Sequence, residues 1–115
     1  MPICEEEIIN ECRRRDIVQA VYLLGSAVKG TMRRDSDIDV AVMLAPGDAS
    51  SRSALMDMGA VLALKLGHEV DIGLVSSANL VYARQVILTG KRLYARDQTF
   101  VESREAELLG LYARF

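Results

Sequence analysis

The sequence predicts an α/β protein in which a small mixed β-sheet is flanked by helices. Two observations support this prediction: short, almost wholly apolar runs alternate with segments whose apolar residues recur every three or four positions, and glycines follow several of these segments. Such alternation is typical of helices packed on a sheet. The chain has 115 residues and shows no repeat or linker, so we expect a single domain over residues 1–115.

The first half of the chain is expected to contribute one helix and two strands. Ile8, Ile9 and Cys12 have helical spacing, and glutamates precede arginines in this segment, as the helix dipole favours. A β-branched apolar run follows and stops at Gly25, which is typical of a buried strand. The expected elements are a helix over about 3–15, a strand over 17–24, a loop over 26–36, a strand over 38–44 and a turn over 46–48.

The second half is expected to alternate helices with strands. Gly67 and Gly90 follow two segments of helical periodicity, and Ser76 or Ser77 is expected to cap the second of these helices. The apolar side of the last helix suits either the core or a partner surface. The expected elements are a helix over 51–66, a strand over 70–75, a helix over 78–88, a strand over 91–95 and a helix over 100–114.

Composition excludes several classes of protein. The formal net charge is −2, so no strong positive field draws the chain to nucleic acid, and no direct nucleic-acid binding is expected. No apolar run approaches the length of a membrane span. Cys4 and Cys12 lie too far apart along a helix for a disulfide, which fits the reducing cytoplasm. A chain this short buries only a modest fraction of its surface, so a homo- or hetero-oligomer is plausible.

Two aspartates on the second expected strand point to a metal site. Asp37 and Asp39 are two residues apart, so both side chains would leave the same face of a strand. Carboxylates that close repel one another unless a cation compensates, and oxygen ligands suit Mg²⁺. The alternative is an exposed strand face with solvated acids.

A phosphate loop is indicated by Gly25 and Ser26, which follow an apolar strand directly. A glycine allows the backbone to approach a phosphate closely, and a serine adds a hydroxyl donor. Taken alone, the pair is better explained as an ordinary turn. The aspartates that follow a short distance later favour the phosphate interpretation.

A third acid, Asp71, alternates with apolar residues on the next expected strand. If that strand neighbours the strand of Asp39, three carboxylates converge and could hold two metal ions for a phosphoryl displacement. Glu69 is a rival for this role if the strand begins early enough. The other interpretation of Asp71 is an acid at a strand end on a solvated face.

Together, Gly25, Ser26, Asp37 and Asp39 match the pattern Gly-Ser-x10-Asp-x-Asp. This pattern resembles the motif of the polymerase-β-like nucleotidyltransferases. More narrowly, the chain resembles the minimal nucleotidyltransferases (MNT), the antitoxins that pair with HEPN-domain toxins. The segment 89–94 looks like the Gly-x-x-Leu-Tyr strand of that family.

The resemblance implies a polymerase-β-like nucleotidyltransferase fold and a chemistry. ATP with two Mg²⁺ ions would be the substrate, and AMP would pass to a tyrosine hydroxyl of a partner HEPN toxin, which is silenced by the modification. The residues that the resemblance assigns to the site are Gly25, Ser26 and Lys29 for the nucleotide, and Asp37, Asp39 and Asp71 for the metal and for catalysis.

Two alternatives to protein modification stay open. Ala27 and Lys29 stand where relatives often have arginine, and the loss of one positive charge leaves room for a catalytically weak or inactive module that blocks a toxin sterically. Transfer to a small molecule such as an aminoglycoside is the other alternative. The short chain argues against it, because no second domain is present to form a substrate pocket.

Overall fold

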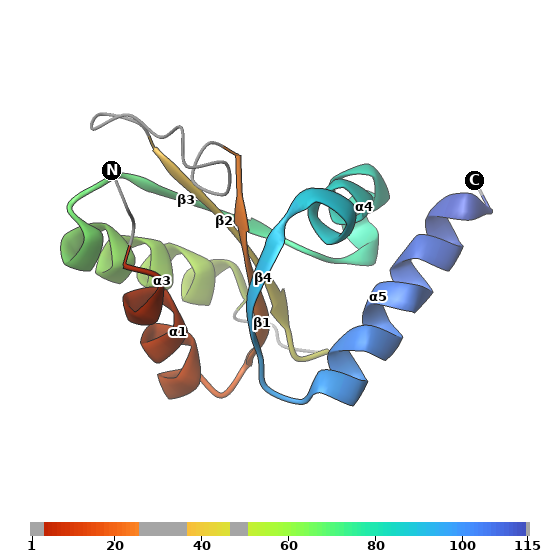
Figure 1. Ribbon diagram of the computed structural model, residues 1–115, viewed down its shortest axis with the longest axis horizontal. Coiled ribbons are helices and arrows are strands. Elements are labelled where there is room, and N and C mark those ends of the chain that lie inside the picture. The colour runs from red at the N-terminus through yellow and green to blue at the C-terminus, as the bar shows by residue number, and fades with distance from the viewer. Residues whose placement is uncertain (1–3, 26–36, 47–50, 115) are drawn as a thin grey trace.

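The computed structural model describes residues 4–25, 37–46 and 51–114, and this part of the chain is built around one four-stranded sheet (Figure 1). The strands lie in the order β3-β2-β1-β4. In chain order the elements are α1 (Glu5–Arg14), β1 (Val18–Leu24), β2 (Ile38–Leu44), α3 (Ser51–Leu66), β3 (Val70–Leu74), the short 3-10 helix η1 (Ser77–Asn79), α4 (Leu80–Thr89), β4 (Lys91–Ala95) and α5 (Gln98–Ala113). The predicted α/β class with a small mixed sheet is confirmed.

The sheet is mixed because it contains both antiparallel and parallel pairs of strands. β1 pairs antiparallel with β2 and with β4, whereas β2 pairs parallel with β3. A parallel pair needs a crossover connection, and α3 lies in that connection. The register places Leu24 opposite Asp39 and Asp39 opposite Asp71. Two acids and the end of β1 therefore meet at the same level of the sheet.

Helices cover both faces of the sheet, α1 and α3 on one side and α4 and α5 on the other (Figure 1). The alternation along β2 supplies both cores: Val40 packs with Leu62 of α3, whereas Ala41 and Met43 pack with Val86 of α4. This matches the expected two-residue period of the strand. Asp39 shares its face with Ala41, so it points toward the α4 side.

One acid of the α1 side is surrounded by bases. The Glu11 side chain is 4% exposed and pairs with Arg14, with Arg15 at 2.7 Å and with Lys65 of α3 at 3.3 Å. Burial alone would raise the pKa of Glu11, but the hydrogen bonds from Arg14, Arg15 and Lys65 outweigh burial and lower it. Glu11 is therefore ionised, and its ion pairs join α1 to α3.

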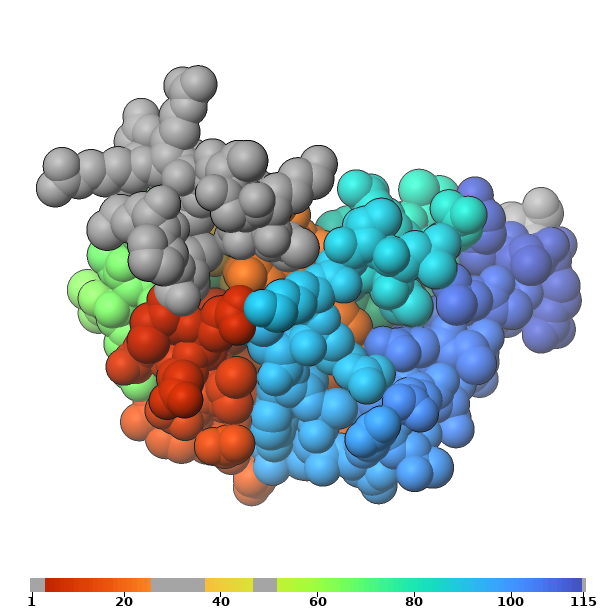
Figure 2. All heavy atoms as spheres, in the orientation of Figure 1, coloured from red at the N-terminus to blue at the C-terminus, as the bar shows by residue number. Residues whose placement is uncertain are grey.

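The fourth strand lies beside α1 on the molecular surface (Figure 2). Lys91 Nζ lies 2.8 Å from Glu5 Oε2. The Arg96 guanidinium, just past β4, donates to the backbone oxygens of Cys12 and Arg15, each at 2.8 Å. The same two carbonyls also accept backbone N–H groups, so Arg96 adds side-chain bonds that tie the end of β4 to the end of α1.

The expectation of one helix over 78–88 needs a correction. The structure has η1 first, capped by the Ser76 hydroxyl, and then α4, whose N-cap is Asn79 rather than Ser76 or Ser77. Asn79 Oδ1 accepts a hydrogen bond from the Tyr82 backbone N–H at 3.1 Å. Serine and asparagine are both strong N-caps, so the sequence holds two start signals, and the first serves only a tight turn.

The last helix also begins earlier than expected, at Gln98, because Asp97 caps it. Its apolar side belongs at least in part to the core, since Val101 and Leu108 are buried there. The expected loop over 26–36 and the residues of the expected turn beyond 46 lie outside the described residues.

Both described cysteines are free thiols, as expected, with Cys4 exposed and Cys12 buried. Among the helices that the structure describes, none is long and apolar enough to cross a membrane.

Candidate active site

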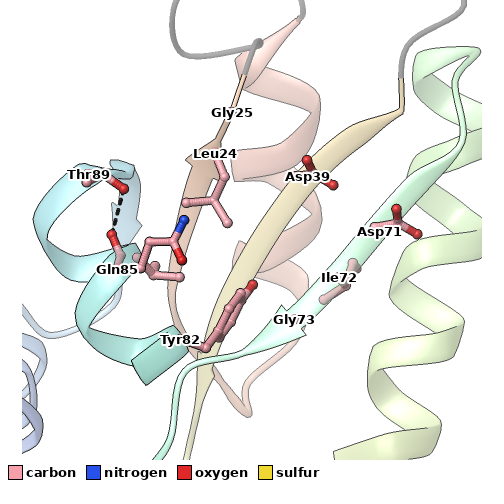
Figure 3. Close-up of a pocket in the computed structure, with 10 residues that line it drawn as sticks. Leu24, Gly25, Asp39, Asp71, Ile72, Gly73, Tyr82, Gln85 and Thr89 are labelled. Carbon is pink, nitrogen blue, oxygen red and sulfur yellow. Dashed lines mark hydrogen bonds between the residues drawn. The ribbon is translucent and has the colours of Figure 1, made fainter. Parts of the chain in front are cut away.

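A pocket of about 460 Å³ opens on the α4 side of the sheet, a volume within the range of small-molecule sites (Figure 3). Its strand wall is acidic and its helix wall is neutral and polar. The residues that matter for its chemistry are Leu24, Gly25, Asp39, Asp71 and Gly73 from the strands and their ends, and Tyr82, Gln85 and Thr89 from α4.

Asp39 and Asp71 form the acidic wall. They are partners in the parallel ladder of β2 and β3, and both line the pocket. Neighbouring strands lie about 4.8 Å apart, so the two carboxylates are close neighbours on one face. The condition set for the convergence of Asp71 with Asp39, that their strands are neighbours, is met.

The electrostatics of Asp39 differ from those of an ordinary surface acid. Burial raises the pKa of Asp39, and the negative charges of Asp71 and Asp37 raise it further. Within the part of the chain that the structure describes, no lysine or arginine forms an ion pair with any of these three acids. A concentration of negative charge without a compensating base is the condition under which carboxylates bind a divalent cation.

Asp37 is exposed and directly precedes β2, as the expected strand over 38–44 implies, and it does not line the pocket. Its expected role as a metal ligand stays a prediction. Asp37 still acts on the pKa of Asp39 through its charge. Among the described residues, no three His, Cys, Asp or Glu side chains are arranged as a ready metal site. Convergence is therefore seen for Asp39 and Asp71 only.

Glu69, the rival of Asp71, lies elsewhere. It precedes β3 and lines a shallow groove against α3 rather than the pocket that contains Asp39. Asp71 is the acid that faces Asp39.

Gly25 lies beside Asp39 at the end of β1. Its φ is +65°, a conformation that favours glycine, and a Cβ at this position would lie 3.4 Å from Asp39 Oδ2. The backbone therefore turns at the edge of the acidic wall, where the phosphate interpretation requires it. Ser26 and Lys29 lie outside the described residues, so their expected roles stay predictions.

Three residues of α4 belong to the pocket although the sequence analysis did not single them out. Tyr82, Gln85 and Thr89 are spaced by three and four, so they share one face of the helix. Their polarity on one side of a mostly apolar helix was the available signal. It was insufficient, because only the packing of α4 on the sheet shows which face meets the acids.

The family is identified by comparison with known proteins. Residues 6–99 match the family described as Polymerase beta, Nucleotidyltransferase. The chain therefore belongs to the polymerase β nucleotidyltransferase family, as the spacing of its glycine, serine and aspartates predicted.

Within this family, the chain is similar to a protein of known name. The chain is 38% identical over 81 residues to the protein adenylyltransferase MntA of Shewanella oneidensis. The matched segment spans 70% of this chain but only 57% of that relative.

Solved structures agree over nearly the whole chain. A chain in a toxin–antitoxin crystal structure with AMP-PNP superposes with a TM-score of 0.82 at 32% identity, over 97% of this chain and 89% of that one. A chain of a complex between the tri-AMPylated HEPN toxin and the MNT antitoxin of Shewanella oneidensis superposes with a TM-score of 0.75 at 30% identity, over 96% and 84%.

Proposed function

We propose that this chain is a metal-dependent protein adenylyltransferase that transfers AMP from ATP to a tyrosine hydroxyl of a HEPN-domain toxin and thereby acts as its antitoxin. The observation that carries the proposal is the pair Asp39 and Asp71, opposed on one face and without a described basic partner, beside Gly25 in a pocket of about 460 Å³. A module that only blocks a toxin sterically gains nothing from paired like charges.

The donor set fits Mg²⁺. Hard oxygen ligands suit this ion, and burial together with the negative charges of Asp71 and Asp37 raises the pKa of Asp39, which supports a cation site there. We assign Asp39 and Asp71 as ligands, with Asp37 joining them as the third acid. When bound, the metal would stabilise negative charge on the attacking and leaving oxygens, and two ions would serve both.

The proposed reaction displaces pyrophosphate from ATP. The acceptor oxygen forms a bond to the α-phosphorus, and the bond from that phosphorus to the oxygen that bridges it to the β-phosphorus breaks. Asp71 accepts the hydroxyl proton as general base, within reach of the pocket that it lines. Gly25, with Ser26 and Lys29 after it, would contact the phosphates.

The acceptor is assigned from the relatives. The similar Shewanella protein is named a protein adenylyltransferase, and the similar structures include a toxin that carries AMP together with its MNT antitoxin. We therefore assign a HEPN toxin as partner and the cytoplasm, where thiols stay reduced, as the location.

The test is transfer of label from ATP labelled in its α-phosphate to the product of the neighbouring gene, which we expect to be the HEPN toxin. Wild type with Mg²⁺ is expected to label the toxin, and chelation of the metal is expected to abolish the label. Asp71→Asn, which keeps the shape but removes the charge, is expected to lose transfer. Asp16→Asn, an exposed aspartate just after α1, is the matched control and is expected to behave as wild type.

Toxin that is neutralised without carrying AMP, by wild type and Asp71→Asn alike, would support the steric alternative instead.

A further inference from the structure

The helix wall of the pocket has a chemistry of its own, distinct from that of the acids. Tyr82, Gln85 and Thr89 present a hydroxyl, an amide and a second hydroxyl, all uncharged, across the cavity from Asp39 and Asp71 (Figure 3). The Thr89 hydroxyl is already occupied, because it donates to the Gln85 backbone oxygen at 2.6 Å. The Tyr82 hydroxyl and the Gln85 amide are the groups left to meet a ligand.

Tyr82 occupies its position only because residue 73 is glycine. A Cβ built on Gly73 would lie 2.1 Å from the Tyr82 hydroxyl oxygen and 2.5 Å from Cζ, far inside van der Waals contact. The ring therefore lies directly against the β3 backbone, and its hydroxyl points along the pocket toward Asp39 (Figure 3). Within the described residues, that hydroxyl makes no hydrogen bond.

The Tyr82 hydroxyl is suited to donate a hydrogen bond. Burial raises its pKa, so the hydroxyl keeps its proton. A neutral O–H can donate to an oxygen of a bound nucleotide without adding repulsion.

Gln85 directs its side-chain amide from α4 into the pocket (Figure 3). Among the described residues, this amide has no hydrogen-bond partner, since the one bond at Gln85 uses its backbone oxygen. A glutamine amide pairs with adenine through one donor and one acceptor, matching N7 and the N6 amino group. Guanine offers two acceptors on the same edge, so the amide can satisfy only one of them at a time.

We propose that Tyr82 and Gln85 hold the nucleoside part of the substrate, with Gln85 selecting adenine and Tyr82 donating to an oxygen of the nucleotide. The proposal rests on the proposed function, in which the triphosphate lies at the acidic wall. The neutral base then extends along the same continuous cavity to the neutral wall of α4. Gly73 is the residue that makes room for this arrangement.

The first test compares the binding of non-hydrolysable ATP and GTP analogues by isothermal titration calorimetry with Mg²⁺. Wild type is expected to prefer the ATP analogue by about tenfold, the discrimination typical of a paired amide. Gln85→Met, of similar length but without the amide, is expected to lose the preference through weaker binding of the ATP analogue. Gln98→Met, at the exposed start of α5, is the matched control.

Equal binding of the two analogues by wild type, or an unchanged preference in Gln85→Met, would overturn the role of Gln85. Wild type that binds neither analogue would instead contradict the proposed function itself. Selective binding of the ATP analogue without AMP transfer would support the role of Gln85 and contradict the proposed function.

The second test removes the Tyr82 hydroxyl. Tyr82→Phe is expected to weaken binding of the ATP analogue by about two- to tenfold, the effect of one hydrogen bond. Gly73→Ala is expected to weaken it more, because the ring itself must move. Tyr112→Phe on α5 and Gly59→Ala, where the nearest atom to a new Cβ would lie at 3.7 Å, are the controls. Unchanged affinity in Tyr82→Phe would contradict the role of Tyr82.

Discussion

Two acids of this small protein, Glu11 and Asp39, lie on opposite faces of the sheet in opposite electrostatic surroundings. Glu11 is buried among Arg14, Arg15 and Lys65, and their hydrogen bonds lower its pKa. Asp39 has other acids as its charged neighbours, and burial together with their charge raises its pKa. The first acid is arranged for stability and the second is not.

The difference separates a structural face from a functional one. Ion pairs on the α1 side hold two helices together around the Glu11 carboxylate. Like charges on the α4 side cost folding free energy, and proteins retain such an arrangement at functional sites where a ligand supplies the missing charge. Substitutions at the two acids should therefore have opposite effects on activity and on stability.

The largest expected effect follows from Asp39→Asn. We expect AMP transfer to fall on the order of a thousandfold, because a metal ligand contributes several kcal/mol of transition-state stabilisation and each 1.4 kcal/mol is about tenfold in rate. The melting temperature should stay the same or rise, since a repelled charge is removed. Transfer assays and thermal unfolding on the same sample measure both. A variant that loses activity by unfolding would argue against a catalytic role for Asp39.

The next largest effect is a loss of stability without a loss of activity. Glu11→Gln leaves Arg14, Arg15 and Lys65 without their shared carboxylate, so we expect unfolding to become easier by about 1–3 kcal/mol. Chemical denaturation measures this change. The rate of AMP transfer by the folded variant should be unchanged. Glu6→Gln, at an exposed position of the same helix, is the control and should alter neither quantity.

The sequence predicted much of what lies on each face of the sheet. It did not predict which residues of different strands meet on a face. Alternation along β2 predicted that Asp39 and Val40 lie on opposite faces of the sheet, and strands were expected close to all four described positions. The neighbourhood of Asp39 and Asp71 depended on strand order, which local patterns do not determine. Asp37 directly precedes β2 and does not line the pocket, so its role as the third acid stays a prediction.

The helix wall of the site was missed for a related reason. In the sequence, Gly73 is an ordinary glycine of a strand. In the structure, the ring of Tyr82, nine residues later, lies against it. The side chain that needs the space comes from another element, and only the packing of α4 on β3 brings them together.

The pH dependence of the free energy of unfolding should change in opposite directions when Glu11 and Asp39 are substituted. The lowered pKa of Glu11 means that its contribution is present above its unfolded pKa and is lost as pH falls through the folded value. The raised pKa of Asp39 means that its protonated form is favoured by folding, so its contribution is present at low pH and is lost as pH rises. We therefore expect Glu11→Gln to flatten the acid loss of stability between about pH 5 and pH 2, and Asp39→Asn to steepen it. Changes of the same sign in both variants would contradict the comparison.

The smallest expected effect comes from a polar residue that lies on the α4 side but outside the pocket. It tests whether every polar group on this side contributes to AMP transfer. Tyr22 is buried on that side, and its hydroxyl donates to Glu105 at 2.7 Å, while Arg92 also pairs with Glu105. Tyr22→Phe leaves Glu105 with Arg92, so we expect a loss of about 1 kcal/mol in unfolding free energy and no change in transfer. A large loss of transfer would mean that the active region extends beyond Asp39 and Asp71.

The rate of AMP transfer to the HEPN toxin by Asp39→Asn and by Glu11→Gln, at equal concentrations of folded protein, tests the central claim most directly. If Asp39 and the acids beside it on the α4 side are the catalytic site, Glu11→Gln transfers AMP at the wild-type rate and Asp39→Asn is slower on the order of a thousandfold. Equal rates in the two variants, or a slower rate in Glu11→Gln, would contradict that claim.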